Sequence, residues 1–153
     1  MRRMTGAGVC VAAVVAAVGG AAPGAGAADG PRAGLAYHGW AGLSAGRVDL
    51  RFTPRNDGPT AVAESVVRLH WSQPLADRQE LPEACARAGE RLLTCRVGAL
   101  GGHRAGERIA LRVLLRGAPT EVSLEFETAG SGAAVDGDRQ RVLVLDTGDT
   151  YAF

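Results

Sequence analysis

An apolar run near the end of the chain, residues 142–145, leads directly into Asp146-Thr147-Gly148. A carboxylate presented in this way can do acid–base chemistry when a second carboxylate shares its proton, as in aspartic proteases. The chain contains one Asp-Thr-Gly, and a catalytic loop of this kind lies early in its lobe, where later strands support the substrate. Only five residues follow Gly148. We therefore interpret the segment as the exit of a final strand that ends at Leu145.

Acids on both sides of this strand are candidate ligands for calcium, which prefers carboxylate oxygens. Two aspartates precede the strand and two follow it: Asp136, Asp138, Asp146 and Asp149. A strand over residues 139–145 spans roughly 20 Å at ~3.3 Å per residue, so the two pairs lie at opposite ends and cannot form one site. Two carboxylates are few for a calcium ion. We expect no metal site and keep calcium at either end as the alternative.

Other chemistry-bearing residue types are scattered. His38, His70 and His103 fall on separate segments, and His38 shares a strand face with Trp40 while His70, next to Trp71, points the other way. No acid or histidine stands in a recognisable triad order with a serine, and the paired glycines lie in hairpin connections, not in strand-to-helix turns that cradle phosphate. We therefore expect a protein that is not an enzyme and that needs no cofactor.

Four aromatic residues are candidates for packing or for binding. Trp71 is typical of the tryptophan that many sandwiches bury between their sheets. Trp40 is a candidate binding residue, although a core position is the favoured interpretation for both tryptophans. Tyr151 and Phe153 stand close together at the end of the sequence, where a frayed tail would not need them. We predict that one of the two docks on the domain or offers an edge to a partner.

Strands must position these residues. Apolar and polar residues alternate with period two through most of the chain, and no segment keeps the helical spacing of apolar residues over three turns. Seven strands are expected, over residues 35–40, 47–53, 64–71, 92–97, 108–116, 121–128 and 140–145. Such strands, separated by turn residues, favour an all-β, immunoglobulin-like Greek-key sandwich of two sheets. An eight-stranded barrel is the alternative.

The short connection at residues 117–120 predicts a hairpin between the two strands that flank it. With Leu115 opposite Val122, the apolar residues of both strands face the same side, and Arg112 then lies opposite Glu125 on the other side. Opposite charges that face each other across a ladder contribute roughly 0.2 to 1 kcal/mol per pair. The agreement of the two patterns supports this register.

The connection at residues 72–89 breaks both periodicities and is long for a loop. It contains Cys85, which we predict to form a disulfide with Cys95, because these two cysteines remain once the N-terminal leader described below, with Cys10, is removed, and an even number in an exported domain usually pairs. A bridge between these positions stabilises by roughly 2 to 3 kcal/mol in the chain-entropy model. Pro82 suits the first position of a helix, so a short helical turn is expected over residues 82–88.

Residues 1–28 have the layout of a secretory signal peptide. Two arginines precede an apolar stretch over residues 7–18, and small residues follow it. The apolar stretch is shorter than the ~20 residues that cross a bilayer. Cleavage after Ala27 or Ala28 would leave residues 29–153 as one domain without a membrane span. The protein is therefore expected to be secreted, either free outside the cell or associated with the cell wall.

The amino-acid composition and net charge limit the classes of partner that we expect. All 17 basic residues are arginine, which is typical of a GC-rich genome such as that of an actinobacterium. Removal of the leader also removes Cys10 and leaves a formal charge near −1. Such a balance directs the protein neither to nucleic acid nor to an anionic membrane.

A turn signature follows the second expected strand. Asn56 and Asp57 tolerate turn conformations, Gly58 permits a positive φ and Pro59 cannot continue a ladder, so these residues end the strand. The stretch resembles the Asn-x-Gly-Pro-Ser/Thr-x-Ala signature of immunoglobulin-like repeats of unknown function on bacterial surfaces. Later pieces match in the same order: Leu81-Pro82, Cys85, Leu93 to Leu100 and Gly106-Glu107.

The resemblance covers residues 47–145 and implies a module of the cell wall or cell surface, with a cysteine pair and no catalytic residues. This chain differs in having one copy where those repeats stand in tandem. It is also similar to small exported proteins of streptomycete type that have no assigned activity. We expect a monomeric, non-catalytic module that binds or supports an unidentified envelope or extracellular partner. A calcium-dependent adhesin or a secreted enzyme that uses the C-terminal acids is the alternative.

Overall fold

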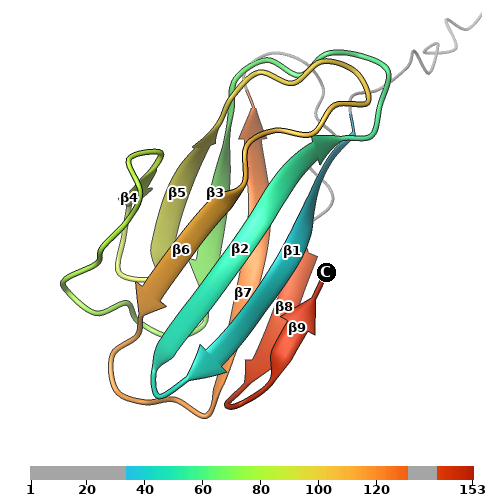
Figure 1. The fold of residues 1–153 in the computed structure, drawn as a ribbon. Helices are drawn as coiled ribbons and strands as arrows, with labels where there is room; N and C mark the ends of the chain where they lie inside the picture. Colours follow the sequence, from blue (N-terminus) through green and yellow to red (C-terminus); the bar gives the residue numbers. More distant parts are fainter. Residues whose placement is uncertain (1–33, 131–140) are drawn as a thin grey trace, which may run out of the picture.

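The computed structural model describes residues 34–130 and 141–153, in which nine β-strands form two antiparallel sheets that pack face to face (Figure 1). The strands are β1 (Leu35–Ser44), β2 (Arg47–Asn56), β3 (Ser65–Trp71), β4 (Cys85–Arg87), β5 (Leu92–Val97), β6 (Ile109–Leu114), β7 (Glu121–Gly130), β8 (Arg141–Asp146) and β9 (Thr150–Ala152). One sheet has the order β6-β2-β1-β9, and the other has the order β4-β5-β3-β7-β8. The predicted all-β sandwich with one disulfide is confirmed. The described residues form no helix that could cross a membrane.

Each sheet turns one face inward, because apolar residues alternate with polar ones along its strands. The inward side chains of Val48, Leu50 and Phe52 on β2, for example, are at most 1% exposed. Aromatic rings link the two sheets at the centre of the core. The centroid of Phe126 lies 5.5 Å from that of Tyr37 and 5.4 Å from those of Phe52 and Phe153. The core therefore joins strands from both sheets and the C-terminal tail.

All seven expected strands are present, and β4 and β9 are additional. The predicted helical turn over residues 82–88 is wrong, because Cys85–Arg87 are extended and pair with β5. Cys85 lies directly opposite Cys95 in this pair, and the predicted disulfide joins the two. Pairing with β5 gives this stretch the backbone hydrogen bonds that a helical turn would otherwise have supplied.

The predicted hairpin between β6 and β7 is wrong. β6 pairs with β2, so that Arg112 lies opposite Asp49, whereas β7 pairs with β3 and β8 and places Glu125 opposite His70. The connection between β6 and β7 carries the chain from one sheet to the other, and the apolar sides of the two strands belong to facing sheets. Period-two alternation fits both arrangements, because it says which face is buried and not which strand is the neighbour.

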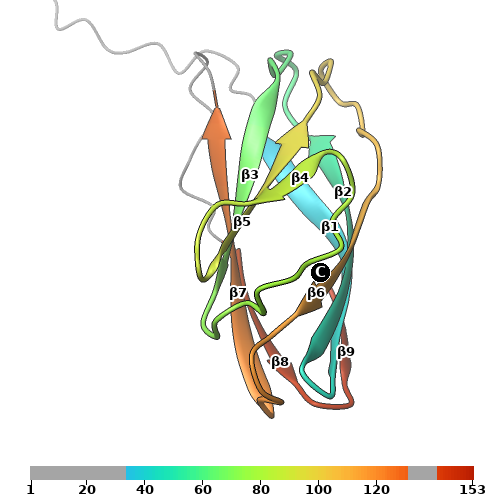
Figure 2. The same ribbon diagram turned by 90° about the vertical axis from the view of Figure 1, so that its left-hand side faces the viewer.

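The segment 72–91 leaves β3, reaches the edge of β6 in the facing sheet and returns to its own sheet before β5, on the side of the sandwich that faces the viewer in Figure 2. Its first part adds to the free edge of β6 through isolated bridges between Leu75 and Leu115 and between Glu80 and Arg112. Its later part forms β4 on the edge of the other sheet. One long connection therefore covers part of two sheet edges.

Candidate functional site

A hollow of about 230 Å³ opens on the β6-β2-β1-β9 sheet. Its lining comes from β1, from β2 and from the residue before β6: His38, Gly39, Trp40, Arg51, Phe52, Thr53 and Arg108. The ladder sets Trp40 opposite Arg51 and His38 opposite Thr53. These four residues alternate with the buried residues of their strands, so they share the outer face of the sheet. The sheet thus gathers an indole, an imidazole, a hydroxyl and guanidinium groups in one place.

Positive charge dominates the hollow. The guanidinium of Arg51 lies 5.2 Å from the centroid of the Trp40 ring, which is a cation–π distance. Arg108 brings a second guanidinium, and no Asp or Glu lines the hollow. Asp49, also on β2, is engaged by two other arginines at N···O distances of 3.2 and 3.3 Å. Within the described part of the chain, neither Arg51 nor Arg108 takes part in an ion pair.

The two tryptophans have different positions. Trp71 is 2% exposed and belongs to the core, as predicted. Trp40 is only half-buried and stands on the outer face, so the favoured interpretation of it as a core residue is wrong. Trp40 was a candidate binding residue from the sequence, whereas Arg51 and Arg108 were not. The alternation along β2 signals that Arg51 faces outward, but not which residue of β1 stands beside it.

The C-terminal residues form β9, which pairs with β1. Phe153 packs against the core beside Phe126, which confirms the prediction that an aromatic residue of the tail docks on the domain. The Tyr151 hydroxyl donates to the carboxylates of Asp146 and Asp149 at 3.2 and 3.3 Å. Burial raises the pKa of Tyr151, although a backbone hydrogen bond at Asp146 opposes the change. A role of Tyr151 or Phe153 in binding a partner stays a prediction.

The acids of the alternative calcium hypothesis are only partly described. Asp146 and Asp149 approach each other through the shared Tyr151 hydroxyl, whereas Asp136 and Asp138 lie outside the described residues. Across residues 34–130 and 141–153, no group of three or more His, Cys, Asp or Glu is placed to hold a metal ion. A calcium site therefore stays an alternative hypothesis.

Asn56, the first residue of the turn signature, has a structural role beyond ending a strand. Asn56 is fully buried, and its side chain joins four points of the backbone. Its Oδ1 accepts from the amides of Gly34 at 3.3 Å and Gly58 at 3.1 Å, and its Nδ2 donates to the carbonyls of Thr60 at 2.7 Å and Gly101 at 3.1 Å. A side-chain amide can make just these four bonds. We call this arrangement the Asn56 junction.

The other signature residues pack around the junction. Gly58 is buried but does not have a positive φ, so the predicted reason for a glycine here is wrong. Its carbonyl accepts from the amide of His103 at 3.0 Å. A Cβ added to Gly102 would lie 2.1 Å from the carbonyl oxygen of Pro59, so the two loops touch backbone to backbone. Asp57 is exposed and pairs with Arg55 at 2.8 Å.

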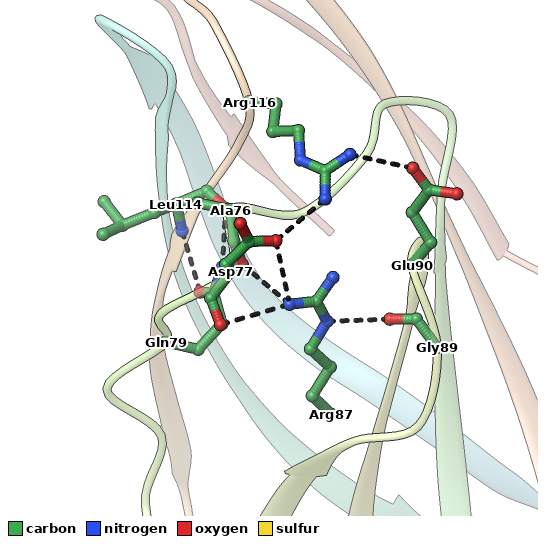
Figure 3. Close-up of polar contacts among 8 residues, drawn as sticks. All are labelled: Ala76, Asp77, Gln79, Arg87, Gly89, Glu90, Leu114 and Arg116. Carbon is green, nitrogen blue, oxygen red and sulfur yellow. Dashed lines mark hydrogen bonds and ion pairs between the residues drawn. The ribbon is translucent and has the colours of Figure 1, made fainter.

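A second polar arrangement holds the segment 72–91 at the other end of β6 (Figure 3). Arg116 donates to Asp77 at 2.8 Å and to Glu90 at 3.0 Å. Arg87 donates to backbone carbonyls of residues 76, 77 and 89 at 3.0 to 3.2 Å. The hydrogen bond from Arg116 lowers the pKa of Asp77, and the same bond raises the pKa of Arg116. We call Asp77, Arg87, Glu90 and Arg116 the charged cluster.

The three histidines lie apart. His38 lines the hollow, His103 lies in the loop beside the Asn56 junction, and His70 is on β3. The His70 ring contacts Glu127 through a hydrogen bond of 2.7 Å, and this bond lowers the pKa of Glu127. Each histidine has its own surroundings, and those of His38 include the guanidinium groups of Arg51 and Arg108.

Comparisons with known proteins gave no match to a family model, to a curated protein or to a solved structure. The resemblance to immunoglobulin-like repeats of bacterial surfaces therefore stays a prediction.

Proposed function

We propose that the protein is an exported, non-catalytic binding module that holds an anionic polysaccharide at the cell envelope or outside the cell. The observation that carries the proposal is the pairing of Trp40 with Arg51 in a hollow that contains a further arginine and no carboxylate. Export is supported by the layout of residues 1–28 and by the disulfide, since disulfides persist in oxidising compartments.

The side chains suit a charged sugar better than a simple ion. A guanidinium recognises a carboxylate or phosphate through paired hydrogen bonds. An indole offers a flat apolar surface with one polar group, and the Thr53 hydroxyl and the His38 ring can bond to sugar hydroxyls. Small residues lie beside Trp40 and Arg51 in the ladders, namely Ala152 and Ala110. A polymer can therefore lie across neighbouring strands without a bulky side chain in its path.

Binding to polygalacturonate, measured by titration calorimetry, tests the proposal. We expect Arg51→Gln and Trp40→Ala each to weaken binding by about tenfold, the effect of losing one charged hydrogen bond or one aromatic contact. Neutral dextran should not bind. Polyglutamate, which has the charge but no sugar, should bind more weakly and should not respond to Trp40→Ala.

Arg78→Gln is the matched control, because it removes the same charge from an exposed residue of the segment 72–91. Binding that falls equally in Arg78→Gln and Arg51→Gln would reduce the interaction to attraction by net charge. Binding that survives both Arg51→Gln and Trp40→Ala would exclude the hollow as the site.

A further inference from the structure

A second, larger groove lies between the end of β5 and the start of β6. Figure 2 turns the side of the sandwich with these two strands to the viewer. Its volume is about 580 Å³. Its floor includes Val97, Leu100 and Ile109, which are 2 to 8% exposed, and its rim includes Arg96 and Arg108. The groove therefore combines an apolar floor with a positively charged rim, which one acid, at position 107, partly offsets.

The edge of β6 is open in this groove. The backbone of Leu114 points away from β2, because its amide donates to Gln79 Oε1 at 3.0 Å and its carbonyl accepts from the amide of Ala76 at 2.8 Å. Successive residues of a strand point their backbone groups to alternate sides. The amides and carbonyls of Arg112 and Ala110, two and four residues earlier, therefore also point to the free edge.

The segment 72–91 covers only part of that edge. Its Glu80 forms a bridge with Arg112, which is the last contact of this kind toward the start of β6. The chain then turns away through Pro82 to form β4 in the other sheet. Within the described residues, Ala110 pairs with Arg51 of β2 and with no strand on its other side. Pro82 and Ala110 both line the groove, so the open edge forms part of its wall.

The walls are held in place by the neighbouring loops. The Gly106 amide donates to the Pro54 carbonyl at 2.8 Å, and a Cβ added to Gly106 would lie 2.9 Å from the Leu100 side chain. The backbone amide of Asn56 also donates to the Arg104 carbonyl at 2.8 Å. A groove with fixed walls is ready to bind, because little order has to be imposed on it.

We propose that this groove binds an extended acidic peptide segment of another protein, which adds as a strand to β6. The amide and carbonyl of Ala110 supply backbone hydrogen bonds, and alternate side chains of the peptide lie on the apolar floor. Arg96 and Arg108 at the rim favour a peptide that carries Asp or Glu next to the apolar residues. The groove adjoins the polysaccharide hollow, and Arg108 lines both.

The substitution Ala110→Pro provides the sharpest test. It removes the outward amide, but the amide does not bond to β2, and proline is tolerated where a strand edge is free. Phage-displayed random peptides of about twelve residues would be selected on the wild-type protein and depleted on Ala110→Pro. We expect peptides that alternate apolar residues and carry Asp or Glu, with affinity lowered at least about tenfold by Ala110→Pro. Ala110→Thr, which keeps the amide, should bind as the wild type does.

Hydrogen exchange of the wild-type protein tests the same idea without a substitution. In the free protein the amide of Ala110 should exchange rapidly, while those of Ile109 and Leu111, which point to β2, should be protected. A bound peptide should slow exchange at Ala110. The proposal fails if no peptide is enriched over the Ala110→Pro selection, or if selected peptides leave the Ala110 amide unprotected. Trp40→Ala should leave peptide binding unchanged, which separates this outcome from that of the polysaccharide test.

Discussion

Two regions of the molecule hold long connections by different means. The Asn56 junction ties together the loops that follow β2 and β5 with one buried amide whose four hydrogen bonds are all made. The charged cluster ties the segment 72–91 to the end of β6 with more groups, but they are exposed: the Asp77 side chain is 82% exposed and that of Arg116 is 48% exposed. The Asn56 junction holds loops beside the groove, and the charged cluster holds the segment 72–91 against the edge of β6.

The comparison teaches that burial, and not the number of polar contacts, decides how much such a region stabilises the fold. A buried group that loses its partner has no water to replace it. An exposed ion pair can exchange its partner for water and is screened by salt, so its loss costs little. Substitutions in the two regions should therefore differ in effect even though each removes hydrogen bonds.

The largest effect is expected for Asn56→Asp. A carboxylate keeps the two acceptor positions but loses both donors, and it then faces the carbonyls of Thr60 and Gly101. We expect the free energy of unfolding at neutral pH to fall by about 3 to 5 kcal/mol, the cost of an uncompensated buried charge. Urea denaturation measures it. Asp57→Asn, a change of similar size in the exposed neighbour, is the control. A loss no greater than that of the control would overturn the comparison.

Loss of the disulfide should have the next largest effect. The Cys85–Cys95 bridge closes a loop with a sequence separation of 10, so its removal in a Cys85→Ala, Cys95→Ala variant should cost about 2 to 3 kcal/mol. The bridge also holds β4, which carries Arg87 of the charged cluster. Urea unfolding with and without reductant measures the cost, and the variant itself should not respond to reductant. A wild type that is insensitive to reductant would contradict this prediction.

The pH dependence of stability sharpens the contrast between buried and exposed groups. Burial raises the pKa of Tyr37 to about 12, against an opposing hydrogen bond with the Thr128 hydroxyl. Between pH 10 and 12 the unfolded chain ionises this tyrosine while the folded protein keeps it neutral, so stability falls as pH rises. The loss reaches about 1.4 kcal/mol at pH 11. The chain has no lysine that would titrate in this range.

Tyr37→Phe should remove most of this alkaline loss, and Tyr151→Phe, at an exposed hydroxyl whose pKa is also raised, should remove a smaller part of it. Urea unfolding at several pH values from 9 to 11.5 separates the two. An equal pH dependence in Tyr37→Phe and the wild type would show that the buried hydroxyl is not its source.

The smallest effect is expected for the exposed pair of the charged cluster. Asp77→Asn and Arg116→Gln should change the unfolding free energy no more than ordinary surface substitutions do, and less still at high salt. The lowered pKa of Asp77 implies a stabilising contribution that is present above the ordinary carboxyl pKa and is lost as pH falls through the lowered value. Arg87→Gln should cost more than either, because Arg87 bonds to backbone carbonyls and its side chain is 27% exposed. A double-mutant cycle with a large Asp77–Arg116 coupling would contradict this ranking.

Much of the fold could be predicted from the sequence, because the signals are local. The alternation of Val48, Leu50 and Phe52 with polar residues marks β2 and its buried face whatever strand lies beside it. The pairing of two cysteines in an exported domain needs no knowledge of topology either. The extended β4 was missed because three residues are too few to show a period, and their strand pairing comes from β5.

The sequence could not predict which residues that are distant in the chain become neighbours in the fold. The same alternation let Arg112 face Glu125 in a hairpin, whereas the structure places it opposite Asp49. From the sequence, Asn56 is typical of a turn residue. Nothing near it in the chain indicates that the distant Gly101 carbonyl accepts a hydrogen bond from its side chain.

The sequence by itself determined the strands, their buried faces, the disulfide and the N-terminal layout that predicts export, because each depends on residues close together in the chain or on residue type alone. Only the tertiary structure decided which strands pair, and with that the hollow around Trp40 and the open edge at Ala110. Both sites combine residues from strands that the sequence separates widely. Their physical cause is the ladder between β1, β2 and β6, whose register depends on the packing of the whole core.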